Sequence, residues 1–289
     1  METETRTRAA ARPAERLLPW AFGVPVAAWQ IVFFAMPVAF LVVVTFWKVA
    51  NFRLSPDFVF DNWVKVLGST PFQRALVFTL QTAGLTTVLA VLLAFPAAYV
   101  ITFKLGPTAR RLAIGALIVP VFSSYILRVY AWQILLSPQG VINALFGAMG
   151  FGPVEMLGNS FALQVGLLTL TLPVATLVLV FGLSAVDRTL IEASENLGCP
   201  PHRVITNVLI PAVRPAILTA ATTVFLLSFG DYVSPVFLGG SRPPTLSILI
   251  VDTVKSGSQW PQASVIGVAM LLILSLAFVA AHLFARGRK

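Results

Sequence analysis

The sequence predicts an all-α integral membrane protein with six transmembrane helices. Of its 289 residues, 57% are hydrophobic and 11% are charged, whereas soluble domains are far more polar. Four uncharged stretches are each longer than the roughly 20 residues that a helix needs to cross the hydrocarbon core. They are residues 21–47, 75–103, 156–186 and 256–281. Two further stretches, 112–136 and 215–241, are each interrupted by a single charge, Arg128 and Asp231 respectively.

The first stretch is expected to remain in the protein as a membrane anchor. It is too long for the apolar region of a signal peptide, and no small-residue cleavage pattern follows it. Residues 1–20 are rich in Arg, Ala, Thr and Glu, and we expect them to form a mobile cytoplasmic tail. The transmembrane domain then covers residues 21–289.

The distribution of basic residues predicts that both termini are cytoplasmic. Thirteen of the 20 Lys and Arg residues fall on the side of the termini, six fall on the other side, and Arg128 lies within a span. Basic residues near helix ends are retained in the cytoplasm. This topology accounts for the net charge of +9, so the charge does not indicate a nucleic-acid partner. Cys199, the single cysteine, cannot form an internal disulfide and is assigned no redox role.

The two outer loops are expected to contain short helices. In the first, residues 48–73, apolar residues amid polar ones suit a short interfacial helix after Asp61. In the second, residues 137–160, glycines surround a segment at 142–149 that can form another. Four prolines fall inside spans, where each can kink its helix because it removes a backbone donor. They are Pro37, Pro96, Pro120 and Pro173.

A polar cytoplasmic hairpin, residues 187–211, is predicted between the fourth and fifth stretches. Asp187 can cap a first helix, and Gly198 can end it in the left-handed conformation. The Pro200–Pro201 pair can open a second helix, which Pro211 is expected to stop. The first helix has an apolar face that is stable only when covered. This face comprises Leu190, Ile191, Ala193 and Leu197.

The spacing within this hairpin resembles the E-A-A signature loop of permease subunits in binding-protein-dependent ABC importers. Glu192-Ala193-Ser194 is followed by three residues, Gly198, nine residues, and a V-L-I-P run that ends at Pro211. The departures from the family pattern are conservative: serine replaces the second alanine, Val208 replaces isoleucine, and Ile210 replaces leucine. The resemblance implies a type I importer-like bundle whose hairpin docks on an ATP-hydrolysing subunit. From the helix pattern alone, a helical loop lying against the bilayer remains open.

The two charges within spans are candidates for the substrate pathway. At 1.5 Å per residue, Arg128 and Asp231 each lie about 24 Å from the inner face, which makes them possible partners. Alternatively, Arg128 reaches the outer headgroups and Asp231 begins an outer loop. Near them, Tyr125, Trp132 and Tyr232 could hold an amine by cation–π attraction, although such aromatics also form anchoring belts.

Three stretches around these residues look like the spermidine/putrescine permease branch. They are 120–132 (PVFSSYILRVYAW), 140–143 (GVIN) and 230–240 (GDYVSP…LGG). Tyr125 departs from the small hydroxyl residue expected there. This resemblance implies import of a polyamine such as spermidine or putrescine. It also implies an ATP-binding subunit dimer, a second related permease and a solute-binding protein, in a bacterial cytoplasmic (inner) membrane. The outer loops, with six basic and four acidic residues, form no acidic funnel.

The chain is expected to be a non-catalytic subunit without a cofactor. No lysine is preceded by glycine, so the G-x-x-x-x-G-K-[ST] phosphate loop is missing, and ATP would be bound by a partner subunit. His202 and His282 are the only histidines, and no metal-ligand cluster is predicted. Two other functions stay open: an ion-coupled secondary transporter that uses Arg128 and Asp231, and a membrane scaffold whose hairpin recruits a cytoplasmic partner.

Overall fold

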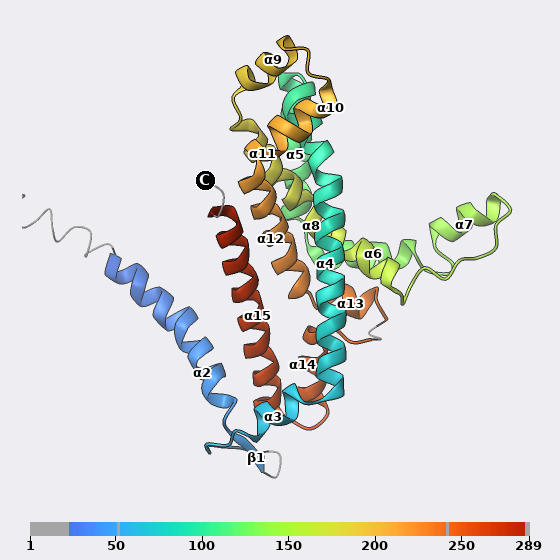
Figure 1. The fold of residues 1–289 in the computed structure, drawn as a ribbon. Helices are drawn as coiled ribbons and strands as arrows, with labels where there is room; N and C mark the ends of the chain where they lie inside the picture. The colour runs from blue at the N-terminus through green and yellow to red at the C-terminus, as the bar shows by residue number, and fades with distance from the viewer. Residues whose placement is uncertain (1–22, 51–52, 241–242, 287–289) are drawn as a thin grey trace, which may run out of the picture.

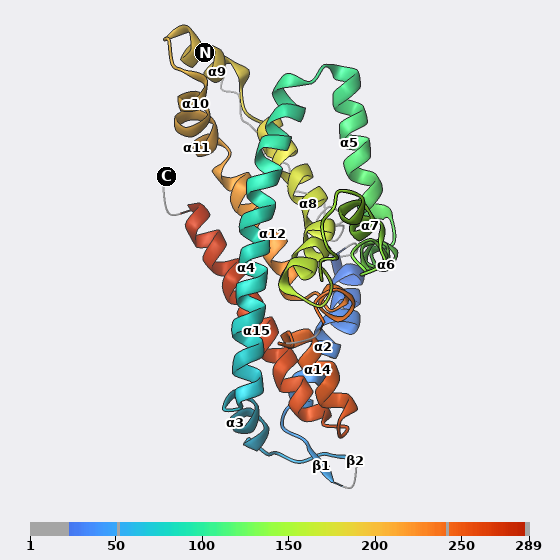
Figure 2. The ribbon, with the colours of Figure 1, turned by 90° about the vertical axis from the view of Figure 1, so that its right-hand side faces the viewer.

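The computed structural model describes residues 23–50, 53–240 and 243–286; the expected tail at 1–20 lies outside these ranges. Long helices run side by side, with a helical hairpin at one end of the bundle and a small β-hairpin at the other (Figure 1). Figure 2 shows the α4–α5 turn at the same end as the helical hairpin. The predicted inner and outer loops therefore gather at opposite ends.

Four helices are long and apolar enough to cross a membrane. The first, Gly23–Val44, includes a π-helical segment at Ile31–Ala35 and α2 (Met36–Val44). The second, Thr70–Lys104, consists of α4 (Thr70–Tyr99) and the π-helical Val100–Lys104. The others are α8 (Ser160–Ser184) and α15 (Trp260–Arg286).

Two further spans are bent helix pairs. The third joins α5 (Pro107–Phe122) to α6 (Tyr125–Leu135) at 94°, and the fifth joins Pro201–Ala212 to α12 (Arg214–Phe229) at 73°. Counting each pair as one span gives the predicted six for the described part of the chain. A continuous helix over 112–136 was wrong. The Ser123 hydroxyl donates to the Pro120 carbonyl at 3.0 Å, and extended backbone at Ser123 and Ser124 turns the chain.

The centre of the bundle is a trio of helices, α4, α8 and α12, that contact one another. Ala90, Ala94 and Ala98 are fully buried at a spacing of four residues on α4. Small residues let helix backbones approach closely inside a membrane, where dispersion contacts replace the hydrophobic effect. Near the cytoplasmic end, a Cβ at Gly182 of α8 would lie only 2.1 Å from the Ala216 Cβ of α12. Helix α2 leaves this centre and contacts α15 (Figure 1).

The first outer loop forms a cap that the sequence predicted only in part. The expected interfacial helix is confirmed as α3 (Asp61–Leu67). An antiparallel hairpin of β1 (Lys48–Ala50) and β2 (Arg53–Ser55) precedes it and was not predicted. Asn62 ties α3 to the end of the first span, since its side-chain amide donates to two backbone carbonyls there, at 2.9 and 2.8 Å.

The second outer loop contains the expected short helix, α7 (Val141–Ala148). Asn143 holds the loop closed, because its amide exchanges hydrogen bonds with the backbone N–H and carbonyl of Val154, at 2.8 and 3.0 Å. Two short helices follow α12: α13 (Val233–Phe237) and α14 (Leu246–Lys255). Helix α13 packs on α8 at Gly166, where a Cβ would lie 2.6 Å from the Ser234 hydroxyl.

Candidate functional site

The cytoplasmic hairpin begins with a capped helix, as predicted. The Asp187 carboxylate accepts a hydrogen bond from the Thr189 N–H at 3.0 Å and starts α9 (Arg188–Asn196). This bond favours the ionised carboxylate, so it holds the pKa of Asp187 below its usual value. At the other end, Gly198 has φ +77°. Its N–H donates to Glu195 and the Cys199 N–H donates to Ser194, at 2.9 and 3.1 Å, the paired bonds of a Schellman motif.

The second helix of the hairpin is longer than predicted. It begins at Pro201, as expected, and continues as α10 (Pro201–Arg203), a π-helical segment (Val204–Leu209) and α11 (Ile210–Ala212). The prediction that Pro211 stops it was wrong. Pro211 occupies the first turn of α11, where a proline leaves no hydrogen bond broken. The chain bends instead at Val213, between α11 and α12.

Part of the apolar face of α9 is uncovered. The side chains of Leu190 and Leu197 are 50% and 88% exposed, and Ala193 between them is exposed as well. Ile191 turns the other way and packs against the core between α4, α8 and α12. We call Leu190, Ala193 and Leu197 the α9 stripe. An exposed row of apolar side chains on a short helix is typical of a docking surface.

The predicted coupling residues lie on or beside this stripe. Glu192 is fully in the exposed class, and Ser194 is half-buried with its hydroxyl donating to the Leu190 carbonyl at 2.7 Å. The base of the hairpin is held by contacts that the sequence did not predict. Arg110 of α5 donates to the Ser184 hydroxyl of α8 at 2.7 Å, and Arg188 reaches the Thr102 carbonyl at 3.4 Å.

Tyr125 and Asp231, both predicted pathway residues, are in contact. The Tyr125 hydroxyl donates to an Asp231 carboxylate oxygen at 2.7 Å and also hydrogen-bonds to Ser234. The same carboxylate accepts the N–H groups of Val233 and Ser234, each at 3.1 Å, and so caps α13. Asp231 is only 8% exposed. The hydroxyl of Tyr125 therefore joins α6 to the start of α13, over a separation that no local pattern reveals.

Arg128, the second intramembrane charge, forms no ion pair with Asp231 in the described structure. Its Nη1 donates instead to the Thr169 carbonyl at 2.8 Å. Pro173 lies four residues further along α8 and has no N–H, so this carbonyl lacks its usual helical donor. The guanidinium carbon lies 5.7 Å from the Tyr125 ring centroid, within cation–π range. Tyr125 thus lies between the two charges and contacts both.

The remaining pathway residues are placed differently. Trp132 is half-buried beside Arg128, lines a hollow with it, and packs with the α6–α8–α13 cluster. Tyr232 is half-buried and precedes α13, but its side chain makes no hydrogen bond or ring contact with the described residues. Three of the four aromatic and acidic pathway predictions therefore share one cluster with Arg128, and Tyr232 borders it.

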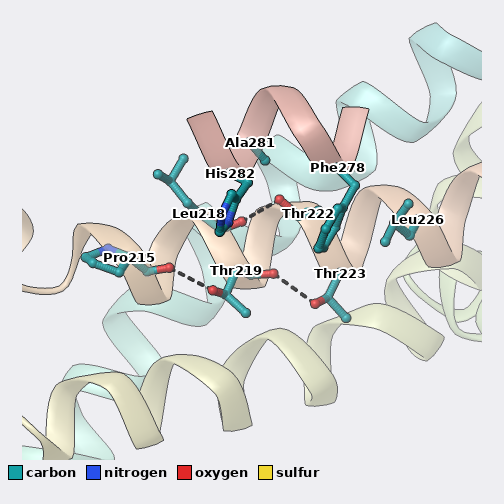
Figure 3. Close-up of a pocket in the computed structure, with 9 residues that line it drawn as sticks. All are labelled: Pro215, Leu218, Thr219, Thr222, Thr223, Leu226, Phe278, Ala281 and His282. Atoms are coloured by element: carbon teal, nitrogen blue, oxygen red, sulfur yellow. Dashed lines mark hydrogen bonds between the residues drawn. The ribbon is translucent and has the colours of Figure 1, made fainter. Parts of the chain in front are cut away.

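A separate hollow lies between α12 and α15, near the cytoplasmic end of α15 (Figure 3). Threonines line the α12 side, and their hydroxyls donate to carbonyls one turn earlier: Thr219 to Pro215 at 2.9 Å and Thr223 to Thr219 at 2.8 Å. On α15 the His282 ring stacks on Phe278, with centroids 6.5 Å apart. No group of three His, Cys, Asp or Glu residues that could hold a metal occurs in the described ranges.

Comparison with known proteins gave clear likenesses in sequence, although no family model matches the chain. The spermidine/putrescine transport system permease protein PotB of Haemophilus influenzae is 24% identical over 254 residues, covering 86% of this chain and 87% of PotB. PotB of Escherichia coli is 24% identical, with 88% and 92% covered. The E. coli inner membrane ABC transporter permease protein YdcU is 25% identical, with 81% and 80% covered.

The fold has counterparts among solved ABC transporters. A chain of the bacterial alginate ABC transporter, solved in complex with an alginate pentasaccharide-bound periplasmic protein, aligns with a TM-score of 0.76 at 17% identity, covering 96% of each chain. A chain of the MetNI methionine ABC transporter aligns with a TM-score of 0.56 at 17% identity, covering 76% and 99%. The relatives are transport permeases, in keeping with a non-catalytic subunit. The chain is a multi-pass protein of the bacterial inner membrane that, as predicted, resembles the spermidine/putrescine permeases in sequence and has the fold of ABC importer permeases.

Proposed function

We propose that this chain is one of two related transmembrane subunits of an ATP-driven importer. The observation that carries the proposal is the α9 stripe, which the fold presents at the cytoplasmic end of the bundle and leaves uncovered. An ATP-binding subunit dimer would cover the stripe. Binding of ATP, on those subunits, would move the hairpin of residues 187–212 and open the pathway outward; hydrolysis would reset it.

The hairpin is built to transmit such a movement. The Schellman motif fixes the angle between α9 and the next helix, and Arg188 and Arg110 tie the base to the ends of α4 and α8. The close contact of Gly182 with Ala216 joins the two legs. Because closely packed helices move as units rather than deform, displacement of α9 would reach α8 and α12 directly. Glu192, Ala193, Ser194, Gly198 and Pro211 are the proposed coupling residues.

We propose a polyamine such as spermidine or putrescine as the transported solute, delivered by a solute-binding protein. The support is the likeness to PotB together with the state of Asp231. Its carboxylate has no ion-pair partner in the described structure, and a carboxylate offers about four lone-pair sites, of which Tyr125, Val233 and Ser234 use three. An ammonium group could take the remaining site, with the aromatic faces of Tyr125 and Trp132 beside it.

The test is copurification of an ATPase with the tagged chain, expressed with its neighbouring genes. Gly198→Pro should abolish it, since proline cannot adopt φ +77° and would lose the N–H that bonds to Glu195. Glu192→Ala should weaken ATPase association, whereas Glu195→Ala is a matched exposed acid on the same helix and should retain more ATPase. An ATPase that stays bound to folded Gly198→Pro, or never binds the folded wild type, would contradict the proposal and favour an ion-coupled transporter.

A further inference from the structure

The hollow beside Arg128 has one charged side chain in an apolar lining. It lies in the corner where α6 turns away from α5, against α8 (Figure 1). Arg128 and Trp132 come from α6, and the other lining residues are apolar except for one threonine. Those residues are Pro120, Val165, Leu168, Thr169, Leu172 and Pro173. The Thr169 hydroxyl is occupied within its own helix, where it donates to the Val165 carbonyl at 2.7 Å.

The guanidinium of Arg128 has hydrogen-bonding capacity that the protein does not use. Only Nη1 is engaged, with the Thr169 carbonyl. Nε is buried without a partner, and Nη2 has no hydrogen bond to any described residue. Nε and Nη2 form one edge of the planar group, and this edge matches two oxygens of a phosphate or carboxylate. A cation in an apolar setting is costly unless an anion neutralises it.

We propose that this hollow binds an anionic phospholipid, with its phosphate on the Nε–Nη2 edge of Arg128 and an acyl chain along Leu168 and Leu172. A hydrophilic solute would leave most of its polar groups unpaired against this lining. A phospholipid supplies both the anion and the apolar chain. The site is distinct from the proposed solute contacts at Asp231, since the Tyr125 ring lies between the two charges.

The depth of the site suits the outer leaflet. Helix α5 has 16 residues, about 24 Å at 1.5 Å per residue, and it starts at the cytoplasmic end with Pro107. The hydrocarbon core is about 30 Å thick. The long Arg128 side chain, following α5, therefore comes within reach of the outer headgroups, at the level where tryptophans such as Trp132 usually anchor. The bound lipid would hold the α5–α6 corner against α8.

The test is native mass spectrometry of the intact protein with its copurifying partners, in mild detergent. Wild type should retain phosphatidylglycerol, and Arg128→Gln should lower its occupancy about tenfold, the loss of roughly one charge-assisted bond worth 1.4 kcal/mol. Lys65→Gln is the matched control, because it removes an exposed outer charge whose partner is Asp61, and it should retain the lipid. Equal retention by Arg128→Gln and wild type would overturn the proposal.

Two further arms separate the lipid from other occupants. Leu168→Phe fills the hollow while Arg128 remains, and it should also displace the lipid; undiminished retention by this variant would place the lipid elsewhere. After delipidation, phosphatidylglycerol should raise the unfolding temperature of wild type but not of Arg128→Gln, and inorganic phosphate should change neither. An equal rise with inorganic phosphate would assign the site to a free anion instead. Photocrosslinking from position 172 to a second permease rather than to lipid would equally overturn the proposal.

Discussion

Removal of one oxygen atom, by Tyr125→Phe, should cost about 2 kcal/mol of unfolding free energy. The hydroxyl donates to the Asp231 carboxylate at 2.7 Å, and that carboxylate is only 8% exposed. A hydrogen bond to a charged group contributes about 1.5–3 kcal/mol, because its loss leaves a buried charge with fewer partners. The two backbone N–H groups at the start of α13 remain, so the loss should be partial and the fold should persist.

Tyr130→Phe provides the matched control. Tyr130 lies on the same helix and packs its ring on Phe237, with centroids 4.8 Å apart, but its hydroxyl makes no hydrogen bond to the described residues. The assay is equilibrium unfolding in mixed micelles titrated with SDS. We expect a shift of about thirtyfold in the equilibrium constant for Tyr125→Phe and less than about 0.5 kcal/mol for Tyr130→Phe. Equal stability of the two variants would refute the assigned role of the Tyr125 hydroxyl.

Three other substitutions test the remaining parts. Gly182→Ala should destabilise the α8–α12 contact by about 1–3 kcal/mol through overpacking, measured by the same unfolding assay; Gly115→Ala, which has open space around it, should be neutral or slightly stabilising, and equal losses would contradict this. Since the folded-state pKa of Asp187 is depressed, its cap should protect the first α9 amides from hydrogen exchange above about pH 4 and lose them below it, whereas Asp187→Asn should show no such step. Asp231→Asn should impair solute uptake while ATPase copurification persists; normal uptake would remove Asp231 from the pathway.

The hairpin shows what a local pattern can predict. Asp187, Gly198 and Pro201 act within a few residues of themselves, through capping, a left-handed backbone and a fixed φ, so their effects were readable in the sequence. Pro211 was misread because its effect depends on the hydrogen-bond register around it. A π-helical segment precedes it, and the sequence alone does not announce that change of register.

The pathway cluster shows where local patterns stop. Arg128 and Asp231 stand out in the sequence because charges are rare within spans, but their partners come from other helices. Tyr125 and Asp231 are 106 positions apart, and the Thr169 carbonyl is 41 positions from Arg128. The right angle between α5 and α6 brings these groups together. Neither hydropathy nor charge spacing encodes that angle, since both halves of the bent span are equally apolar.

The free carbonyl that Pro173 leaves on α8 makes two distant positions depend on each other. Pro173→Ala would restore a donor to the helix of its own residue, and Thr169 would then have less need of Arg128. The repaired helix would be more regular, while Arg128 would lose its one protein partner inside an apolar corner. Positions 128 and 173 should therefore tolerate change together more readily than either tolerates it alone, so that an apparent defect in one helix is a condition for the charge on another.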